Sequence, residues 1–249
     1  MRGSRGVQEE IANLKPGTCQ PEIKSMADVR ATALMWSGGK DATLALEALR
    51  SRGDYRVEAL VTTVIEEAET VTMHGVPLAL VEAQVAALRL PLHVMRVPPS
   101  PSNTTYEERL ERTLAPLLAR RITTVAAGDV FLEDVRAYRA DLLRRLGAEP
   151  LFPIWGRDTA ALARHFVEAG FRAVVTSVDT EQLAADFVGR TYDADFLRAL
   201  PETVDPCGER GEFHTFVYDG PPFAHAVSVT VGAPHGRGQM RYAGIASGE

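Results

Sequence analysis

The segment best suited to chemistry is the glycine loop Ser37-Gly38-Gly39-Lys40-Asp41, which lies between an apolar run at 31–36 and a helix-like run at 40–52. Two consecutive glycines let the backbone turn tightly and approach a ligand without a Cβ in the way. A helix that begins directly after such a loop presents unpaired N–H groups and a positive dipole end to an anion. Ser37 can donate a hydroxyl, Lys40 carries a cation suited to phosphate, and Asp41 can cap the helix or hold Mg²⁺. The spacing is neither GxxxxGK[ST] nor GxGxxG, and it predicts a phosphate-binding loop of another kind.

A second cluster of ionisable residues lies toward the C-terminal end, in the segment 205–221 (DPCGERGEFHTFVYDGP). Glu209, Glu212 and His214 lie close to glycines here, and carboxylates on such a loop suit metal binding or acid–base chemistry. The alternative is a turn followed by a half-buried strand, in which the side chains of 213–218 alternate between two faces. The residues alone leave both interpretations open.

Two further loops follow predicted strands and carry polar residues. His74 comes after the second strand, and Gly128-Asp129 comes after the fourth. Because the carboxyl ends of parallel strands meet at one edge of a sheet, we expect all three residues to lie near the glycine loop. Gly128 permits a close backbone approach, and Asp129 is suited to bind Mg²⁺, ribose or substrate. On the next helix, Arg136 and Arg139 either bind an anionic acceptor or pair with Glu133 and Asp134.

The elements that position these loops alternate between strand and helix. This alternation predicts an α/β, Rossmann-like fold over 31–180, with a mainly parallel sheet and helices on both faces. Residues 1–30 lack clear periodicity and are expected to form an N-terminal tail. Strands are predicted at 31–36, 56–65, 91–97, 122–127 and 173–178, and helices at 40–52, 78–88, 104–120, 132–146 and 158–169.

The pattern changes after about residue 180. The segment 201–211 is rich in turn residues, and strands are predicted at 213–218, 224–231 and 239–245 with little helix between them. We therefore expect 181–249 to form a smaller, largely antiparallel α+β unit that carries the substrate side of a cleft between two domains.

Composition narrows the functional classes. The 249 residues are 45% hydrophobic and 24% charged, which is typical of a globular protein and excludes disordered and collagen-like classes. The net charge of −6 argues against nucleic acid as a partner. No apolar run approaches the ~18 residues of a membrane span, and Met1–Glu10 has no apolar core of a secretory signal. The two cysteines, Cys19 and Cys207, form no CxxC pair, so we expect a reducing, cytoplasmic location.

The glycine loop resembles the SGGxD[ST] pyrophosphate loop of the N-type ATP pyrophosphatases, or PP-loop enzymes. These belong to the adenine nucleotide α-hydrolase-like (HUP-type) superfamily, whose Rossmann-like sheet agrees with the alternation of strands and helices. Ala42 stands where the pattern usually has Ser or Thr. Together with the GERGEFHT segment about 170 residues later, the loop makes the chain similar to the diphthine–ammonia ligase family, in its bacterial-type subgroup. The resemblance extends from about Thr32 to Pro222, and Arg210 replaces an expected Asn.

The resemblance implies an enzyme with ATP and Mg²⁺ as cofactors. A carboxylate-bearing acceptor, which is a protein in part of the family, attacks the α-phosphate and releases pyrophosphate, and ammonia then displaces AMP from the adenylate. It further implies that Glu212, in preference to Glu209, acts as a base or binds ammonium. Ser37 through Asp41 would hold the phosphates, with Asp41 as the tentative Mg²⁺ ligand and with His74, Gly128 and Asp129 beside the nucleotide. The residues implied to be catalytic are Lys40, Asp41, Glu209, Glu212 and His214.

Two alternatives share the same nucleotide loop. One is a PP-loop enzyme that acts on another acceptor such as tRNA, and the other is a non-catalytic sensor that binds an adenine nucleotide. The acidic charge and the lack of CxxC pairs count against the first, and the GERGEFHT segment counts against the second. The sequence leaves homo-oligomer formation open.

Overall fold

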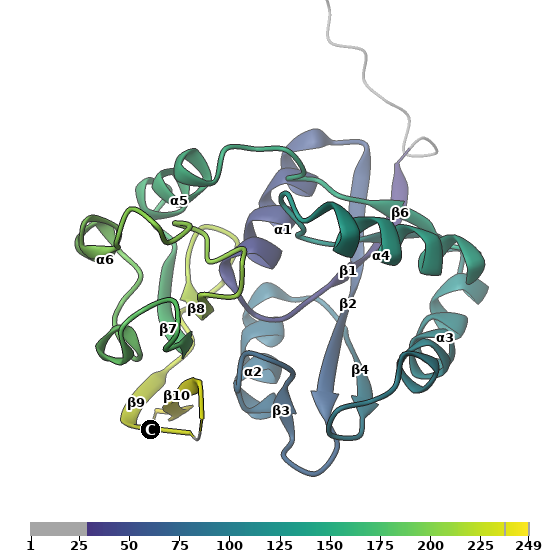
Figure 1. The fold of residues 1–249 in the computed structure, drawn as a ribbon. Helices are drawn as coiled ribbons and strands as arrows, with labels where there is room; N and C mark the ends of the chain where they lie inside the picture. Colours follow the sequence, from purple (N-terminus) through teal and green to yellow (C-terminus); the bar gives the residue numbers. More distant parts are fainter. Residues whose placement is uncertain (1–28, 237, 249) are drawn as a thin grey trace, which may run out of the picture.

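The chain folds into two β-sheets that are joined through the glycine loop at the start of helix α1 (Lys40–Arg52; Figure 1). The computed structural model describes residues 29–236 and 238–248, so the tail expected at 1–30 lies outside the described residues except for its last two. Among the described residues, no helix is both long and apolar enough to cross a membrane.

The first sheet is the predicted parallel sheet. Its strands β4, β2, β1, β5 and β6 are hydrogen-bonded in this spatial order and all run parallel, and the short β3 pairs antiparallel with the end of β2. Chain order therefore reverses direction on either side of β1, and such a switch point forms a crevice for ligands at the carboxyl ends of the strands. The strands are β1 (Arg30–Met35), β2 (Tyr55–Ile65), β3 (Thr70–Val71), β4 (Leu92–Val97), β5 (Thr124–Ala126) and β6 (Glu149–Leu151).

Helices cover both faces of this sheet, as the alternation predicts. Successive side chains of a strand point to opposite faces, and in β1 Leu34 packs in the core on one face while Ala33 packs in the core on the other. The Leu34 face is covered by α1 and α2 (Leu78–Leu88) and continues toward α5 (Thr159–Glu168). The Ala33 face is covered by α3 (Asn103–Ala119) and α4 (Glu133–Arg145).

The second sheet is antiparallel and contains one strand more than expected. Its order is β8 (Phe213–Asp219), β7 (Arg172–Asp179), β10 (Met240–Ser247) and β9 (Val229–His235). We predicted β7 as the fifth strand of the parallel sheet, and this was wrong, because β7 pairs antiparallel with β8 and with β10. Seven of its eight residues are buried, and an apolar run of this kind fits either sheet. The change of sheet therefore falls between β6 and β7, before residue 180.

Long elements agree with the predicted bounds better than short ones. Both α1 and α2 span the predicted 40–52 and 78–88. The strand expected at 224–231 begins instead at Val229. The sequence analysis missed four short elements, which have too few residues to show a period: β3, β6, the 3₁₀ turn Ala185–Phe187 and α6 (Ala194–Ala199).

The packing of α3 on the Ala33 face gives a test of the two-faced sheet. Leu114 on α3 is fully buried against this face, so Leu114→Ala should lower the free energy of unfolding by about 2–5 kcal/mol. Val231→Ala on β9 is the control, because Val231 is 48% exposed and its truncation should cost at most about 0.5 kcal/mol. Urea unfolding measures both, and equal effects would contradict this arrangement.

Candidate functional site

A cavity of about 780 Å³ opens at the carboxyl ends of β1, β2 and β5, at the switch point of the parallel sheet. It lies within the size range of small-molecule sites. Four separate segments meet there: the glycine loop, the loop after β3, the start of α4 and the loop 208–211. The predicted site residues that line the cavity are Ser37, Asp41, His74, Gly128, Asp129, Glu209 and His214.

The glycine loop is so tightly enclosed that its glycines have no room for a side chain. Gly38 has φ +81°, and a Cβ there would lie 2.9 Å from Oε1 of Gln84. A Cβ on Gly39 would lie 3.0 Å from the His74 ring and 3.1 Å from the carbonyl oxygen of Thr215. Gly39 is the N-cap of α1 and offers no capping side chain, and the N–H of Lys40 donates to Oγ1 of Thr215 on β8 at 3.1 Å. The helix therefore starts on the wall of the cavity.

Gly128 fixes the position of that helix from the other side. A Cβ on Gly128 would lie 2.8 Å from the carbonyl carbon and oxygen of Asp41. The end of β5 can approach the first turn of α1 this closely because residue 128 has no side chain.

Lys40 and Asp41 form a buried ion pair, with Nζ of Lys40 2.8 Å from Oδ2 of Asp41. Lys40 is 2% exposed, lies over the ring of Phe213 and does not line the cavity. Burial alone would lower the pKa of Lys40, but the negative charges of Asp41 and its neighbours raise it above its usual range. Burial raises the pKa of Asp41, against the lowering effect of Lys40. Oδ1 of Asp41 is buried without a hydrogen-bond partner, so this carboxylate has a free ligand position beside the cavity.

Two histidine rings lie against each other beside the glycine loop, tilted by 37°. The rings of His74 and His214 are 4.5 Å apart between centroids, and Nδ1 of His74 lies 3.3 Å from the carbonyl oxygen of Thr215. Burial lowers the pKa of His74 to about 4 and holds the pKa of His214 well below its usual range. Both rings are therefore neutral at pH 7. Nε2 of His214 is buried without a partner.

The loop before β8 gives its two glutamates different surroundings. Glu212 is 1% exposed, and its carboxylate accepts the N–H groups of Asp205 and Arg210, each at 2.9 Å. It holds the loop together and does not line the cavity. Glu209 lines the cavity, and burial together with the nearby charge of Asp41 raises its pKa to about 8. Of the two carboxyl groups, Glu209 is the one that can exchange a proton with a ligand near neutral pH.

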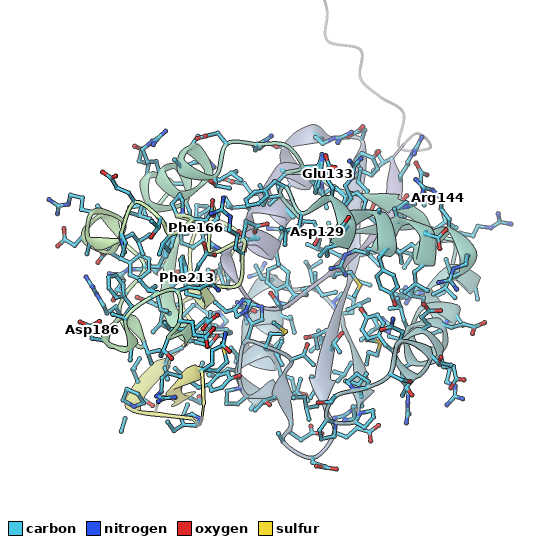
Figure 2. All side chains as sticks on the ribbon, in the orientation of Figure 1. Asp129, Glu133, Arg144, Phe166, Asp186 and Phe213 are labelled. Carbon is cyan, nitrogen blue, oxygen red and sulfur yellow. The ribbon has the colours of Figure 1, made fainter. Side chains whose placement is uncertain are left out.

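Asp129 lies close to the start of α4 (Figure 2) and is paired with Arg139. Nε and Nη2 of Arg139 donate to the two carboxylate oxygens at 2.8 and 3.2 Å, and both residues line the cavity. The sequence analysis expected Arg139 to bind an anion or to pair with Glu133 or Asp134, and the structure pairs it with Asp129 at the cavity wall instead. Arg136 lies over the ring of Trp155, 4.4 Å from the ring centroid.

Sequence reasoning missed Gln84, which supports the loop from α2. Its side chain is fully buried and bonds to Trp36, Gly38 and Val217. The available signal was one amide at a core position of the apolar helix LALVEAQVAAL, since a buried amide without hydrogen bonds is costly.

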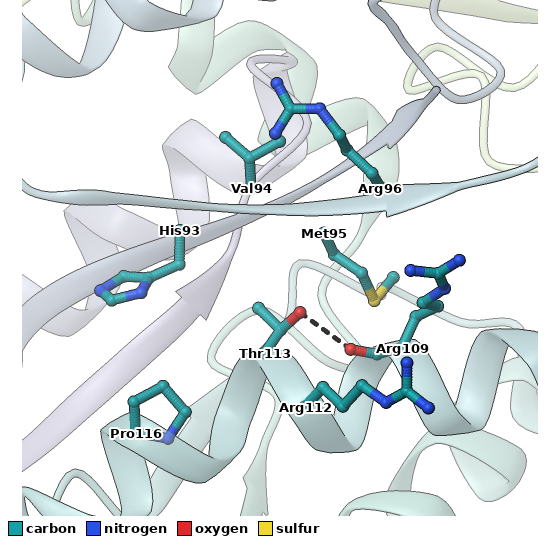
Figure 3. Close-up of a pocket in the computed structure, with 8 residues that line it drawn as sticks. All are labelled: His93, Val94, Met95, Arg96, Arg109, Arg112, Thr113 and Pro116. Atoms are coloured by element: carbon teal, nitrogen blue, oxygen red, sulfur yellow. Dashed lines mark hydrogen bonds between the residues drawn. The ribbon is translucent and has the colours of Figure 1, made fainter. Parts of the chain in front are cut away.

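A second, smaller cavity of about 340 Å³ lies between β4 and α3 (Figure 3). His93 and Met95 point from β4 toward α3, whereas Arg96 points to the other side of the strand. Two of the arginines near this cavity are already paired, Arg96 with Glu69 and Arg109 with Glu66. This cavity therefore lacks the convergent free groups of the first one.

Two family models together match most of the chain. Residues 30–150 match the family described as "Diphthamide synthase N-terminal domain", and residues 158–244 match "Diphthamide synthase C-terminal domain". The gap between the two matches coincides with the change from the parallel to the antiparallel sheet.

Similar curated proteins include three named diphthine–ammonia ligase. The zebrafish (Danio rerio) protein is 30% identical over 42% of this chain and 43% of its own length, and the human (Homo sapiens) protein is 28% identical over 42% and 41%. The fission yeast (Schizosaccharomyces pombe) protein is 27% identical over 44% of this chain and 19% of its own length. The chain therefore matches less than half the length of each of these relatives.

A solved structure from Methanocaldococcus jannaschii, described as a predicted subunit of tRNA methyltransferase, aligns with a TM-score of 0.40 at 17% identity. It covers 58% of this chain and 77% of that chain. At this TM-score the similarity carries no argument about the fold.

The contact between Gly128 and the start of α1 predicts a selective effect on nucleotide binding. Gly128→Ala should displace the Asp41 backbone and raise the Kd of ATP, the expected nucleotide, at least about tenfold. Gly170→Ala is the matched control, because a Cβ there meets open space and only the positive φ of 83° penalises alanine, by about 1 kcal/mol. Calorimetric titration with ATP compares the two, and an unchanged Kd in Gly128→Ala would contradict the predicted role of this contact.

Proposed function

The chain belongs to the diphthamide synthase family, and we propose that it is an ATP-dependent ligase that adenylates a carboxylate and then amidates the adenylate with ammonia. The observation that carries the proposal is the shared cavity, in which the glycine loop and the Glu209 loop face one space. The relatives named diphthine–ammonia ligase suggest a diphthine-like acceptor and ammonia as the nitrogen donor.

The two parts of the cavity suit the two parts of ATP. The first turn of α1 offers backbone N–H groups and a positive dipole end to the phosphates, and Ser37 adds a hydroxyl. The apolar wall offers a site for the adenosine. This wall consists of Met35, Trp36, Val61, Val71, Ala127 and Leu132.

Asp41 fits the part of a Mg²⁺ ligand. Mg²⁺ is usually held by one or two carboxylates together with substrate phosphates and water, and Oδ1 of Asp41 is unpaired beside the phosphate-binding turn. Bound there, Mg²⁺ would neutralise charge on the phosphates. Among the described residues there is no cluster of three or more His, Cys, Asp or Glu side chains that could hold a metal, so the phosphates would supply further ligands. Lys40 acts through Asp41, whose carboxylate it holds in place.

The reaction consists of two displacements. An oxygen of the acceptor carboxylate attacks the α-phosphorus of ATP, the bond to the β-phosphate oxygen breaks, and pyrophosphate leaves. Ammonia then attacks the carbonyl carbon of the acyl-adenylate, and AMP leaves with the electron pair of the broken C–O bond. The adjacent, uncharged rings of His74 and His214 line this space without adding a positive charge that would repel ammonium.

Glu209 is the proposed base of the second step. Its carboxylate takes a proton from ammonium or from the attacking nitrogen, and a pKa near 8 suits that transfer around neutral pH. Glu212, the base preferred from the resemblance, is engaged by two backbone N–H groups instead. We therefore give Glu212 the role of holding the loop that carries Glu209.

Product analysis tests the proposed reaction. With α-labelled ATP, Mg²⁺, ammonium and a diphthine-bearing protein, the chain should release AMP, and hydroxylamine should trap the acyl-adenylate as a hydroxamate. Asp41→Asn should lower AMP release at least about 100-fold. Asp186→Asn is the control, because Asp186 lies in the short turn Ala185–Phe187, outside the cavity. ADP as the product would overturn adenylation.

The raised pKa of Glu209 predicts how amidation depends on pH. Below pH 8 most of the carboxyl groups are protonated, and the fraction that can accept a proton grows with pH, so the rate should rise through about pH 8. Glu209→Gln should lower the rate about 100-fold or more and remove this rise. Ammonium titrates equally in both proteins, so the difference between their profiles reports Glu209. Glu212→Gln should reduce stability and keep the rise, and a lost rise in this variant would return the base to Glu212.

A further inference from the structure

Gln84 is a polar residue on the buried side of a helix that is otherwise built for the core. The buried residues of α2 other than Gln84 are all Leu, Val or Ala, and the Gln84 side chain is 0% exposed. A buried amide costs free energy unless its donors and acceptor are all bonded. The position therefore calls for specific hydrogen bonds.

The amide of Gln84 meets three separate segments. Oε1 accepts the indole N–H of Trp36 at 2.7 Å, and Nε2 donates to the carbonyl oxygens of Gly38 at 2.9 Å and Val217 at 2.6 Å. Trp36 follows β1, Gly38 lies in the glycine loop and Val217 is on β8. The N–H of Val217 also donates to the carbonyl oxygen of Gly38 at 2.9 Å. Two donors thus hold one carbonyl group.

The direction of that carbonyl group decides what the glycine loop presents to a ligand. In a trans peptide the C=O and the following N–H point in opposite directions. With the Gly38 carbonyl held toward α2 and β8, the N–H of Gly39 points the other way, toward Oγ of Ser37 at 3.3 Å on the cavity wall. Phosphate is attracted by N–H groups and repelled by carbonyl oxygens. A flip of this peptide would point its carbonyl oxygen, in place of its N–H, at the bound phosphate and would weaken binding.

We propose that Gln84 is a positioning residue that fixes the Gly38–Gly39 peptide with its N–H toward the phosphates of the nucleotide. The inference rests on the phosphate-binding role in the proposed function and adds a residue outside the cavity to it. Gln84 does not line the cavity, but it bonds both to the Gly38–Gly39 peptide and to Trp36 of the apolar wall, and only the peptide bond sets the direction of an N–H group. Its loss should therefore affect the phosphate end more than the adenosine end. A residue that merely supports the fold would affect both ends alike.

The test compares three ligands on two variants by calorimetric titration. Gln84→Met keeps the length of the side chain and removes both donors, and it should raise the Kd of ATP and of inorganic pyrophosphate at least about tenfold, several-fold more than it raises the Kd of adenosine. Val85→Ala is the matched control, because Val85 is the next buried residue of α2 and its truncation destabilises the core without touching the loop. Equal weakening of adenosine and pyrophosphate, or none, would overturn the proposal.

A second variant covers the case in which Gln84→Met does not fold. In Gln84→Glu the ionised carboxylate faces the carbonyl oxygens of Gly38 and Val217, whereas the protonated form donates to one of them. Relative to the parent chain at each pH, pyrophosphate binding should therefore be weak at pH 8 and recover in part at pH 5.5. A ratio that does not change with pH would contradict the positioning role. If the parent chain binds pyrophosphate but forms no AMP, the ligase proposal fails while the role of Gln84 stands.

Discussion

The rest of the site depends on the close contact between the glycine loop and strand β8. Thr215 of β8 binds the N–H of Lys40 through its hydroxyl, and Val217 binds the carbonyl of Gly38 through its N–H. A loop of backbone atoms can lie this close to a strand because neither Gly38 nor Gly39 carries a Cβ. The segment that leads into β8 is the Glu209 loop, so the same contact brings the proposed phosphate-binding turn and the proposed base into one cavity.

Burial at this contact sets the charges that the cavity presents. Lys40 and Asp41 neutralise each other inside the protein, which lets a cation lie where an isolated one would be costly. His74 and His214 stay uncharged for the same reason, because desolvation disfavours the imidazolium form. Burial also raises the pKa of Glu209, to about 8. Glu212, by contrast, accepts a backbone N–H on each of its two oxygens.

The sequence predicted those features that depend on local pattern. The glycine loop follows from a strand–loop–helix junction, α1 from a helical run of 13 residues, and the parallel sheet from the alternation of strands and helices. The sheet that β7 joins depends instead on pairing partners distant in the chain, which a uniformly apolar run does not specify. The same limit applies to the choice between Glu209 and Glu212. The sequence does not distinguish two carboxylates three residues apart. The structure does, because two backbone N–H groups of the loop donate to Glu212.

The glycine-loop motif fixes the position of Lys40 but not the direction of its side chain. Its position in the loop suggests a point charge for phosphate, yet its ammonium group turns inward to Asp41 and away from the cavity. In the proposed site the attraction for an anion then comes from backbone N–H groups, and these have a fixed direction only if the peptides that carry them are held. A flexible cationic side chain can be substituted by another cationic side chain. A peptide N–H keeps its direction only when the carbonyl oxygen of the same peptide is held by a hydrogen-bond partner. In this chain Val217 and Gln84 are those partners, and Gln84 lies more than forty residues from the loop in sequence. The function of the glycine loop therefore resides as much in α2 and β8 as in its own five residues.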